Sequence, residues 1–327
     1  DQDHSKNYFT NSRGAWIGGE IGKRFSFNAT FYENQSKFPY YLDSVVNITR
    51  VVPGTGRIKR ANDYDYAWAT GSINFELNKH FMFQFGNDKN FIGDGYRSLL
   101  LSDNAFNYPY LKIVTDVWKI RYVNIFAEMQ DLTRYDLQDN EPFQRKYVSM
   151  HYLDLNLGKR ASIGVFETVV WHGDSTGRRG FDLGYMNPFI FFRPVEFSIG
   201  SPDNVLMGFN GKFKLNSKNS LYAQLLLDEF LLKEVKAGNG WWANKQGWQV
   251  GFKSFDVFGV KNLYVQGEYN AVRPYTYQHR DIAGNYGHYR QALAHPLGAN
   301  FYEMLGIARY EYHQWKLEGK LSYALVG

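Results

Sequence analysis

The stretch MGFNGKFKLNSKNSLYAQLLL (residues 207–227) carries the pattern that decides the fold. Apolar and polar residues alternate from Met207 to Leu215, and the polar turn Asn216–Asn219 leads into a second run that starts at Ser220. Alternation with a period of two indicates a β-strand with one apolar face. The stretch therefore predicts an antiparallel hairpin that is closed by a short turn.

The same hairpin recurs along the chain. Tight polar turns also lie at residues 21–24, 77–80, 157–160 and 312–314. The expected strands, about fourteen in number, lie near residues 14–21, 24–33, 66–77, 80–87, 110–116, 118–131, 147–157, 160–171, 204–215, 220–228, 246–257, 262–270, 301–312 and 315–325. The long, irregular connections between hairpins cover residues 34–65, 88–109, 132–146, 172–203, 229–245 and 271–300.

Short turns at one end and long loops at the other are typical of an outer-membrane β-barrel, whose strands face lipid with alternate residues. The chain has 327 residues, 18% aromatic residues and a net charge of +5. Its mean hydropathy of −0.46 does not indicate membrane-spanning helices. An aromatic-rich β-sandwich or a carbohydrate-binding module is the alternative, but a packed sandwich core needs more small residues than these apolar faces offer.

The predicted fold is therefore all-β, with one antiparallel transmembrane barrel domain over residues 1–327, periplasmic short turns and extracellular long loops. The first strand begins on the long-loop side and the last strand ends there, although bacterial barrels normally have both termini in the periplasm. We expect that the barrel is incomplete at both ends and that the intact protein has at least about sixteen strands. A miscounted strand near each end is the alternative.

Two apolar loop segments are candidates for closing the lumen: the leucine-rich segment 91–104 and the run Phe189–Phe192. Two other positions break the alternation of their strands. Around Val123 the apolar residues change parity, which predicts a β-bulge. Glu167 falls on the apolar parity of its strand, so we expect a position at the rim or a second bulge.

Charged residues follow the lumen parity of several strands. A wide lumen needs charges to be wetted and cross-braced, so we expect these residues to pair across it. The predicted brace consists of Lys212, Lys214, Asp228, Lys253, Glu268, Lys316, Glu318 and Lys320. Paired carboxylates such as Asp228 and Glu229 are also what a glycoside hydrolase requires, but the structural role is favoured.

Several kinds of site have no support in the sequence. The absence of cysteine excludes disulfides and thiolate metal sites. The glycine-rich segment 86–104 lacks the order of a P-loop, no Gly-x-Ser-x-Gly motif is present, and scattered Lys and Arg do not indicate nucleic-acid binding. His279, His288 and His295 share one loop with Asp281, but their spacing matches no compact metal motif. We therefore expect no enzymatic activity, no cofactor and no metal.

Aromatic and polar residues gather in two of the predicted outer loops. Aromatic faces beside guanidinium donors suit sugar rings, and Tyr, Trp and Arg equally suit a protein partner. The candidate ligand-binding residues, for a glycan or a protein, are Trp241, Trp242, Arg273, Tyr275, Tyr277 and Arg290.

Five stretches are similar to one family of bacterial barrels. They are GNDKNFIGDGYRSLLLSDNAFNYPYLKI (86–113), FDLGYMNPFIFFRPVEFSIGSPDNVLMG (181–208), LLDEFLLKEVKAGNGWWANKQGWQVG (226–251), GEYNAVRPYTYQH (267–279) and HPLGANFYE (295–303). With these motifs the chain resembles the Wzi-like capsule-assembly family of outer-membrane barrels, and within it the RemB-like branch of the Bacteroidetes, which is associated with gliding motility. The resemblance covers nearly the whole chain, although the family's periplasmic helical segment near the N-terminus is not visible.

The resemblance implies a non-enzymatic barrel of about eighteen strands in the outer membrane. Better-understood members hold capsular polysaccharide, so attachment or assembly of surface polysaccharide is the first functional hypothesis. An accessory barrel in a larger outer-membrane complex, for secretion, gliding motility or envelope assembly, is the second, and a porin is the third. The implied partners are outer-membrane lipids including lipopolysaccharide, surface polysaccharide and other outer-membrane proteins, but no nucleic acid.

Overall fold

The computed structural model describes residues 7–60, 63–132, 143–173, 180–188, 191–199, 203–228 and 244–327. In these residues, fourteen long strands form one antiparallel sheet, and each pairs with the long strands before and after it in the chain. They are β1 (Phe9–Ile21), β2 (Phe25–Lys37), β4 (Tyr64–Glu76), β5 (Phe81–Asp88), β6 (Tyr108–Val117), β7 (Ile120–Asp131), β8 (Gln144–Leu157), β9 (Ala161–His172), β10 (Asn204–Lys214), β11 (Asn219–Leu227), β12 (Gln246–Phe255), β13 (Leu263–Val272), β16 (Phe301–Tyr312) and β17 (Trp315–Val326). All fourteen predicted strands are thereby confirmed.

The long connections contain more regular structure than the sequence predicts. Their additional elements are α1 (Tyr40–Thr49), β3 (Lys59–Arg60), η1 (Leu183–Met186), α2 (Phe192–Ile199), η3 (Ile282–Gly284), β14 (Gly287–His288) and β15 (Gln291–Ala292). A further short helix, η2 (Val257–Gly259), lies in the turn between β12 and β13. The expectation of wholly irregular loops was therefore wrong. None of the helices in the described part of the chain has the length and apolarity to cross a membrane.

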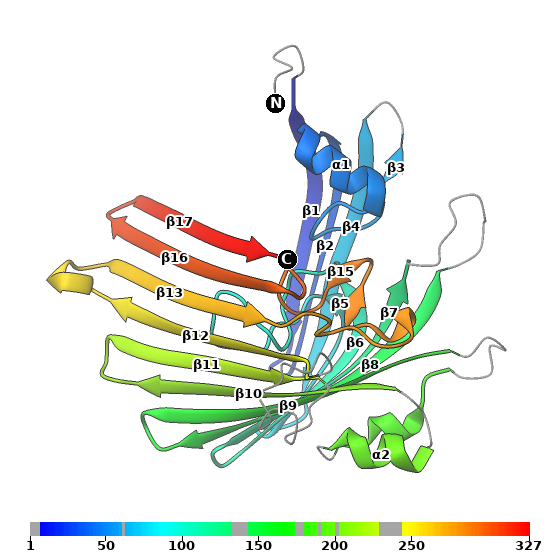
Figure 1. Cartoon of the computed structure of the whole chain (residues 1–327). Helices are drawn as coiled ribbons and strands as arrows, with labels where there is room; N and C mark the ends of the chain where they lie inside the picture. Colours follow the sequence, from blue (N-terminus) through cyan, green and yellow to red (C-terminus); the bar gives the residue numbers. More distant parts are fainter. Residues whose placement is uncertain are drawn as a thin grey trace.

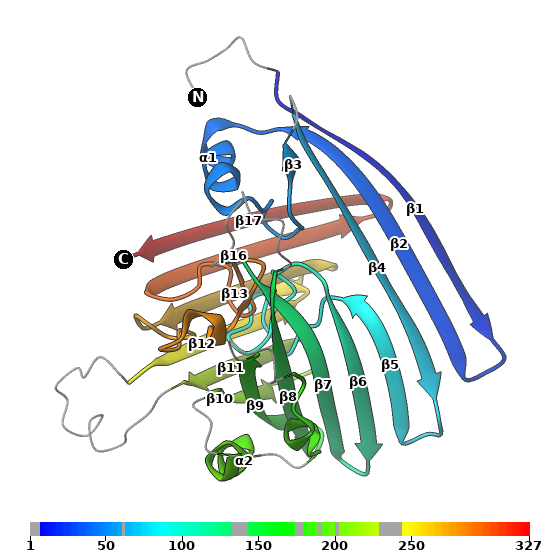
Figure 2. The ribbon, with the colours of Figure 1, turned by 90° about the vertical axis from the view of Figure 1, so that its right-hand side faces the viewer.

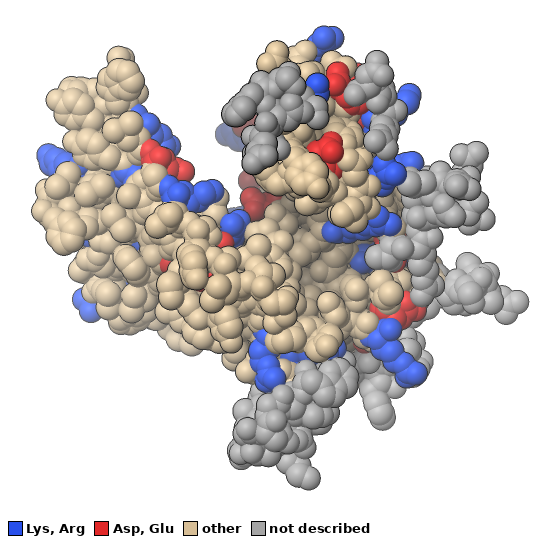
Figure 3. Space-filling model, turned by 45° about the horizontal axis from the view of Figure 1, so that its top comes forward, with Lys and Arg blue, Asp and Glu red and all other residues tan. Residues whose placement is uncertain are grey.

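The sheet curves around a central lumen, with the hairpin turns at one end and the long connections at the other (Figures 1 and 2). β1 and β17 form its two edges, and they do not pair with each other in the described residues. A hollow with charged side chains of both signs on its walls separates the two lobes of the molecule (Figure 3).

The two faces of the wall follow the predicted alternation. On β10, Phe209 and Phe213 point outward and are 40% and 46% exposed, whereas Asn210 between them is buried on the lumen side. The partner strand β11 repeats the pattern, with Leu221 and Leu225 exposed and Gln224 buried. Apolar residues outside and polar residues inside are what a lipid-facing barrel requires.

The predicted β-bulge near Val123 is not present. β7 pairs with β6 and with β8 in an unbroken register through this residue. The apolar parity changes because lumen-facing residues of β7, among them Ile125, Ala127 and Met129, pack into the apolar cluster that fills the lumen. An apolar lumen face, rather than an inserted residue, therefore explains the sequence pattern.

Glu167 is neither at the rim nor at a bulge. It lies in the middle of β9, where the register with β8 and β10 is unbroken, and it is fully buried on the outward face. The backbone N–H of Phe191 donates a hydrogen bond to its carboxylate. The described residues 180–188 and 191–199, here called the strap, cover this part of the wall from outside, and α2 lies there in both ribbon views (Figures 1 and 2).

The strap also corrects the prediction that the run Phe189–Phe192 closes the lumen. Residues 189 and 190 lie outside the described residues, and Phe192 packs against the outward side of His151, with ring centroids 4.1 Å apart. The described part of the run, Phe191 and Phe192, therefore lies at the outer surface of the wall.

Candidate functional site

The lumen is closed by the connection between β5 and β6, residues 89–107, here called the plug loop. Leu99, Leu100 and Leu101 are fully buried and form the centre of the main apolar cluster. Wall residues from β6 to β13, including Ile125 of β7 and Val272 of β13, join this cluster. The prediction that the leucine-rich segment enters the barrel is confirmed.

A buried carboxylate on β13 anchors the plug loop. Glu268 accepts hydrogen bonds from the backbone N–H groups of Tyr96 at 2.8 Å and Arg97 at 3.1 Å. The Tyr222 hydroxyl donates to Glu268 at 2.7 Å and the Asn270 amide at 2.9 Å. Four donors converge on this one carboxylate and hold the plug loop in place.

The neighbouring strands add further anchors. The Gln224 side chain accepts a hydrogen bond from the backbone N–H of Leu99 at 2.8 Å. Asp94 at the tip of the plug loop accepts a bond of 2.5 Å from Lys212 and one of 2.9 Å from Asn210. These anchors lie on β10 and β11, next to the β12 and β13 contacts, so the plug loop is attached mainly to one half of the wall.

The connection between β13 and β16, residues 273–300, lies over the plug loop. The hydroxyls of Tyr277 and Tyr286 donate to the carbonyl groups of Leu99 at 2.9 Å and Leu100 at 2.8 Å. Burial raises the pKa of both tyrosine hydroxyls well above the usual range. Both therefore stay protonated and serve as permanent donors that tie the two loops together.

A buried histidine joins this layer to the wall and the plug loop. His288 Nδ1 accepts a hydrogen bond from the backbone N–H of Gln130 at 3.1 Å, and its Nε2 lies 3.3 Å from the Asn107 carbonyl oxygen. Burial, helped by the nearby charge of Lys146, lowers the pKa of His288 to about 3. The imidazole is therefore neutral, with Nδ1 as acceptor and Nε2 as donor.

This geometry predicts that the loop layer loosens in acid. An unfolded His288 gains its proton near pH 6.5, whereas the folded one stays neutral down to about pH 3, so stability is lost as the pH falls between these values. Hydrogen exchange of residues 286–293 should show local opening that is roughly tenfold or more favourable at pH 4 than at pH 7. His288→Gln should remove most of that difference, and equal opening at both pH values in the unchanged protein would contradict the prediction.

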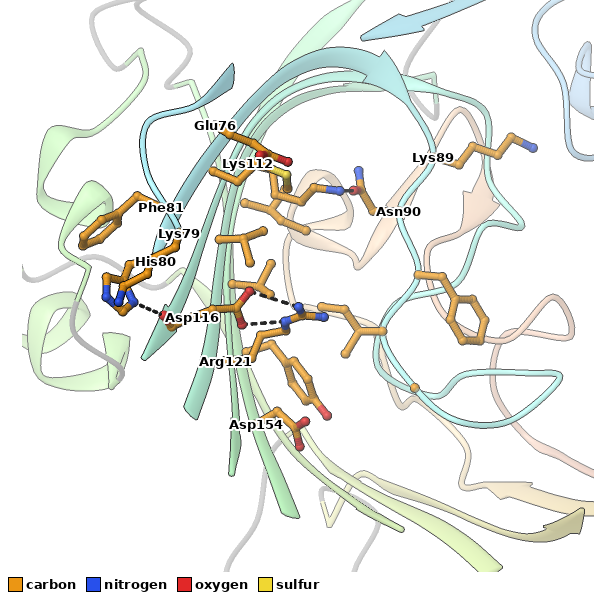
Figure 4. Close-up of a pocket in the computed structure, with 18 of the residues that line it drawn as sticks. Glu76, Lys79, His80, Phe81, Lys89, Asn90, Lys112, Asp116, Arg121 and Asp154 are labelled. Carbon is orange, nitrogen blue, oxygen red and sulfur yellow. Dashed lines mark hydrogen bonds and ion pairs between the residues drawn. The ribbon is translucent and has the colours of Figure 1, made fainter. Parts of the chain in front are cut away.

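A polar cavity of about 720 Å³ lies between the underside of the plug loop and the wall of β4–β8. Figure 4 shows Lys112 bonded to Asn90 of the plug loop and Arg121 bonded to Asp116 by two contacts. The cavity reaches the β4–β5 turn, where His80 contributes to its lining. Its lining includes charged side chains of both signs, so the cavity is a polar vestibule near the short-turn end.

The candidate ligand-binding residues occupy different environments. Trp241 and Trp242 lie outside the described residues. Tyr275 is 54% exposed at the long-loop end, and Arg273 is partly buried beside it. Tyr277 is buried against the plug loop, and Arg290 donates to the carbonyl groups of Leu132, Ile48 and Thr49. Of the described candidates, Tyr275 alone offers an exposed ring, while Tyr277 and Arg290 hold loops together.

The predicted charge brace pairs differently from the expectation. Lys212, Asp228, Glu268 and Lys320 bond to loop residues rather than to charges across the lumen. Glu318 pairs with Arg309 and Lys316 with Glu311, both from adjacent strands. Lys253 lies over the Tyr222 ring, and Lys214 is exposed near the turn. The charged residues of the lumen therefore bond to loop residues more often than they pair across the lumen.

Several anchors of the plug loop were missed by sequence reasoning, namely Asp94, Arg97, Gln224, Gln249, Asn270 and Glu303. The anchors that lie in the wall could have been found from the sequence. Side-chain amides recur at lumen-facing positions of β11–β13, and the loops expected to enter the lumen are rich in leucine. Buried amides of this kind need partners inside the protein. In the described residues no group of His, Asp and Glu side chains could hold a metal ion.

Comparison with known proteins identifies the fold. No family model and no curated protein matches the sequence. Among solved structures, the chain is similar to Wzi of Escherichia coli, an outer-membrane protein involved in group 1 capsule assembly and a carbohydrate-binding β-barrel, with a TM-score of 0.64 and 16% identity. The fold is that of an outer-membrane β-barrel. The match covers 97% of this chain and 65% of Wzi, so the chain spans less than two thirds of that relative.

Porins are also similar, at lower scores. One porin structure gives a TM-score of 0.48 at 10% identity and covers 97% of this chain and 87% of the porin. A porin of Rh. blastica gives 0.43 at 10% identity, with 96% and 84% covered. A barrel with an outward apolar face and a polar lumen spans the bacterial outer membrane, with its long loops outside the cell.

Proposed function

We propose that this barrel holds surface polysaccharide at its long-loop end and is neither an enzyme nor a diffusion pore. The closed lumen carries this proposal, because the plug loop and the layer over it leave the long-loop end as a platform rather than as a channel mouth. The carbohydrate binding of Wzi supports it, as does the resemblance of the sequence to that family. Assignment to the RemB-like branch, and with it a part in gliding motility, is proposed on the quoted motifs alone.

The proposed contact residues are the exposed aromatic rings at the long-loop end. Tyr275 and the pair Trp241 and Trp242 remain candidates from the sequence. The structure adds Tyr40 and Tyr41 of α1, which are both strongly exposed. Ring faces of this kind pack against the C–H faces of sugars while nearby polar groups bind hydroxyls.

The test is binding of capsular or exopolysaccharide from the source bacterium to the detergent-purified protein. Trp241→Ala/Trp242→Ala and Tyr275→Ala should weaken retention by roughly tenfold, since a few aromatic anchors dominate most interfaces. Tyr312→Ala is the matched control, because Tyr312 is comparably exposed but lies at the short-turn end. Unchanged retention in all variants, or stepwise conductance in planar bilayers, would refute the proposal.

A further inference from the structure

The polar vestibule beneath the plug loop is large enough to hold a ligand. Its volume of about 720 Å³ falls within the range of small-molecule sites, roughly 300–1,000 Å³. Asn78 and Lys79 of the β4–β5 turn belong to its lining and are exposed, so the vestibule opens at the short-turn end. Residues 89–94 of the plug loop line it on the side of the long loops. A molecule in the vestibule therefore enters from the periplasmic side.

The charges in the lining of the vestibule balance. Lysine and arginine are matched in number by aspartate and glutamate, the basic residues being Lys79, Lys89, Lys112 and Arg121 and the acidic ones Glu76, Asp94, Asp116 and Asp154. A charged ligand loses its hydration on entering such a space, and this loss is costly unless an opposite charge compensates for it. A lining without net charge therefore favours a ligand without net charge.

Several polar side chains of the lining are held in fixed positions. Arg121 donates two hydrogen bonds to Asp116, at 2.8 and 3.0 Å. Lys112 donates to the side chain of Asn90 at 3.0 Å. Asp94 accepts two hydrogen bonds from side chains of β10, at 2.5 and 2.9 Å. Groups that are already ordered lose little conformational entropy when a ligand binds, so the vestibule is preorganised.

Two groups of the lining have hydrogen-bonding capacity left for a ligand. The Lys112 ammonium group has three N–H donors, and its bond to Asn90 uses one of them. The Asp154 carboxylate accepts no hydrogen bond from the residues that the structure describes. Both residues lie on the wall side of the vestibule, and Arg121 lies between them in Figure 4. Hydroxyl groups suit both, because a hydroxyl accepts from an ammonium group and donates to a carboxylate.

The vestibule also has apolar surface. Phe91 of the plug loop is 38% exposed and lines the vestibule together with Ile92. Val114 of β6 and Val123 of β7 line it from the wall. An aromatic ring offers an apolar face on which the C–H face of a sugar ring packs. Balanced charge, free hydrogen-bonding groups and an exposed ring together match a neutral sugar.

We propose that the vestibule is a binding site for a neutral oligosaccharide that enters from the periplasm. Lys112 and Asp154 bind its hydroxyl groups, and Phe91 packs against a sugar ring. The plug loop separates this site from the long-loop end. The proposal therefore goes beyond polysaccharide binding at the outer surface and does not depend on it.

The test is binding of maltotriose and of cellotriose to the protein purified in lauryldimethylamine oxide, a detergent without a sugar headgroup. Ligand-observed NMR should show saturable binding of at least one trisaccharide. Lys112→Met and Asp154→Ala should each weaken this binding roughly tenfold, because each removes a hydrogen bond to a charged group. Val114→Trp fills the vestibule without removing a polar group and should abolish binding. Each unheated variant should still migrate as a folded species on a gel.

The matched controls lie outside the vestibule. Lys316→Met and Glu318→Ala remove the same kinds of charge from β17 and should leave trisaccharide binding unchanged. Trp241→Ala/Trp242→Ala should also leave it unchanged, so this proposal and the one for the long-loop end can fail separately. Three results overturn the proposal: no saturable binding of either trisaccharide, tighter binding of the zwitterion diglycine, or vestibule variants that weaken binding no more than the controls do.

Discussion

Replacing Glu268 by alanine should release the plug loop while the wall remains assembled. The carboxylate is 5% exposed and accepts hydrogen bonds from two backbone N–H groups of the plug loop, from Tyr222 and from Asn270. Each buried donor that loses its acceptor costs about 1–3 kcal/mol. The closed state of the plug loop is therefore destabilised by several kcal/mol, and its open population rises by roughly a hundredfold or more, since about 1.4 kcal/mol is tenfold.

A single cysteine makes this release measurable. The chain has no cysteine, so Ser102→Cys introduces a unique thiol at a buried plug position. A membrane-impermeant maleimide should label it slowly in the otherwise unchanged protein and far faster with Glu268→Ala. Glu268→Gln retains one acceptor oxygen and should give an intermediate rate.

The control for this experiment is another lumen carboxylate. Glu318 of β17 pairs with Arg309 of β16, and both side chains are exposed to solvent. Exposed ion pairs contribute little to stability, so Glu318→Ala should leave the labelling rate unchanged. Equal labelling rates for Glu268→Ala and Glu318→Ala would show that the plug loop does not depend on the buried carboxylate.

Local sequence patterns were sufficient to predict the strands. Alternation is read within a few residues, and each hairpin closes over a short turn, so the segment from Met207 to Leu227 specifies its own pairing. Parity also indicated that Glu268 and Lys212 face the lumen. The partners of these residues were not predictable, because Tyr96 and Asp94 come from a loop more than a hundred residues away in the chain.

The strap was missed for a related reason. Glu167 interrupts an apolar face, and a local reading offered a bulge or a rim position as explanations. The actual cause is a segment that leaves the long-loop end of β9 and returns along the outside of the wall. A charged residue in the middle of a predicted barrel strand, at a position that should face lipid, therefore has a further explanation beside a break in register. Another segment of the protein can cover that position.

A valine at Gly251 should prevent most of the chain from assembling. The glycine lies on the lumen face of β12, directly opposite Tyr222 of β11 in the strand register. A Cβ atom there would lie 2.2 Å from the Tyr222 ring and 2.3 Å from its hydroxyl oxygen. The ring would have to move away, and Glu268 and Gln266 would lose the hydroxyl that they bond.

The ring escapes the steric clash only by giving up its hydrogen bonds, so the variant carries one cost or part of both. Overpacking costs about 1–3 kcal/mol, and leaving a buried polar group without its partner costs about 1–3 kcal/mol. The heat-modifiable folded fraction on an unheated gel should therefore fall roughly fivefold or more. Gly306→Val is the matched control, because this glycine lies in β16 with no atom near its Cβ position, and valine suits a strand. Tyr222→Ala combined with Gly251→Val should restore part of the assembly, because it removes the steric clash although Glu268 and Gln266 still lack the hydroxyl. A double variant that assembles no better than Gly251→Val would place the damage outside the Tyr222 contact.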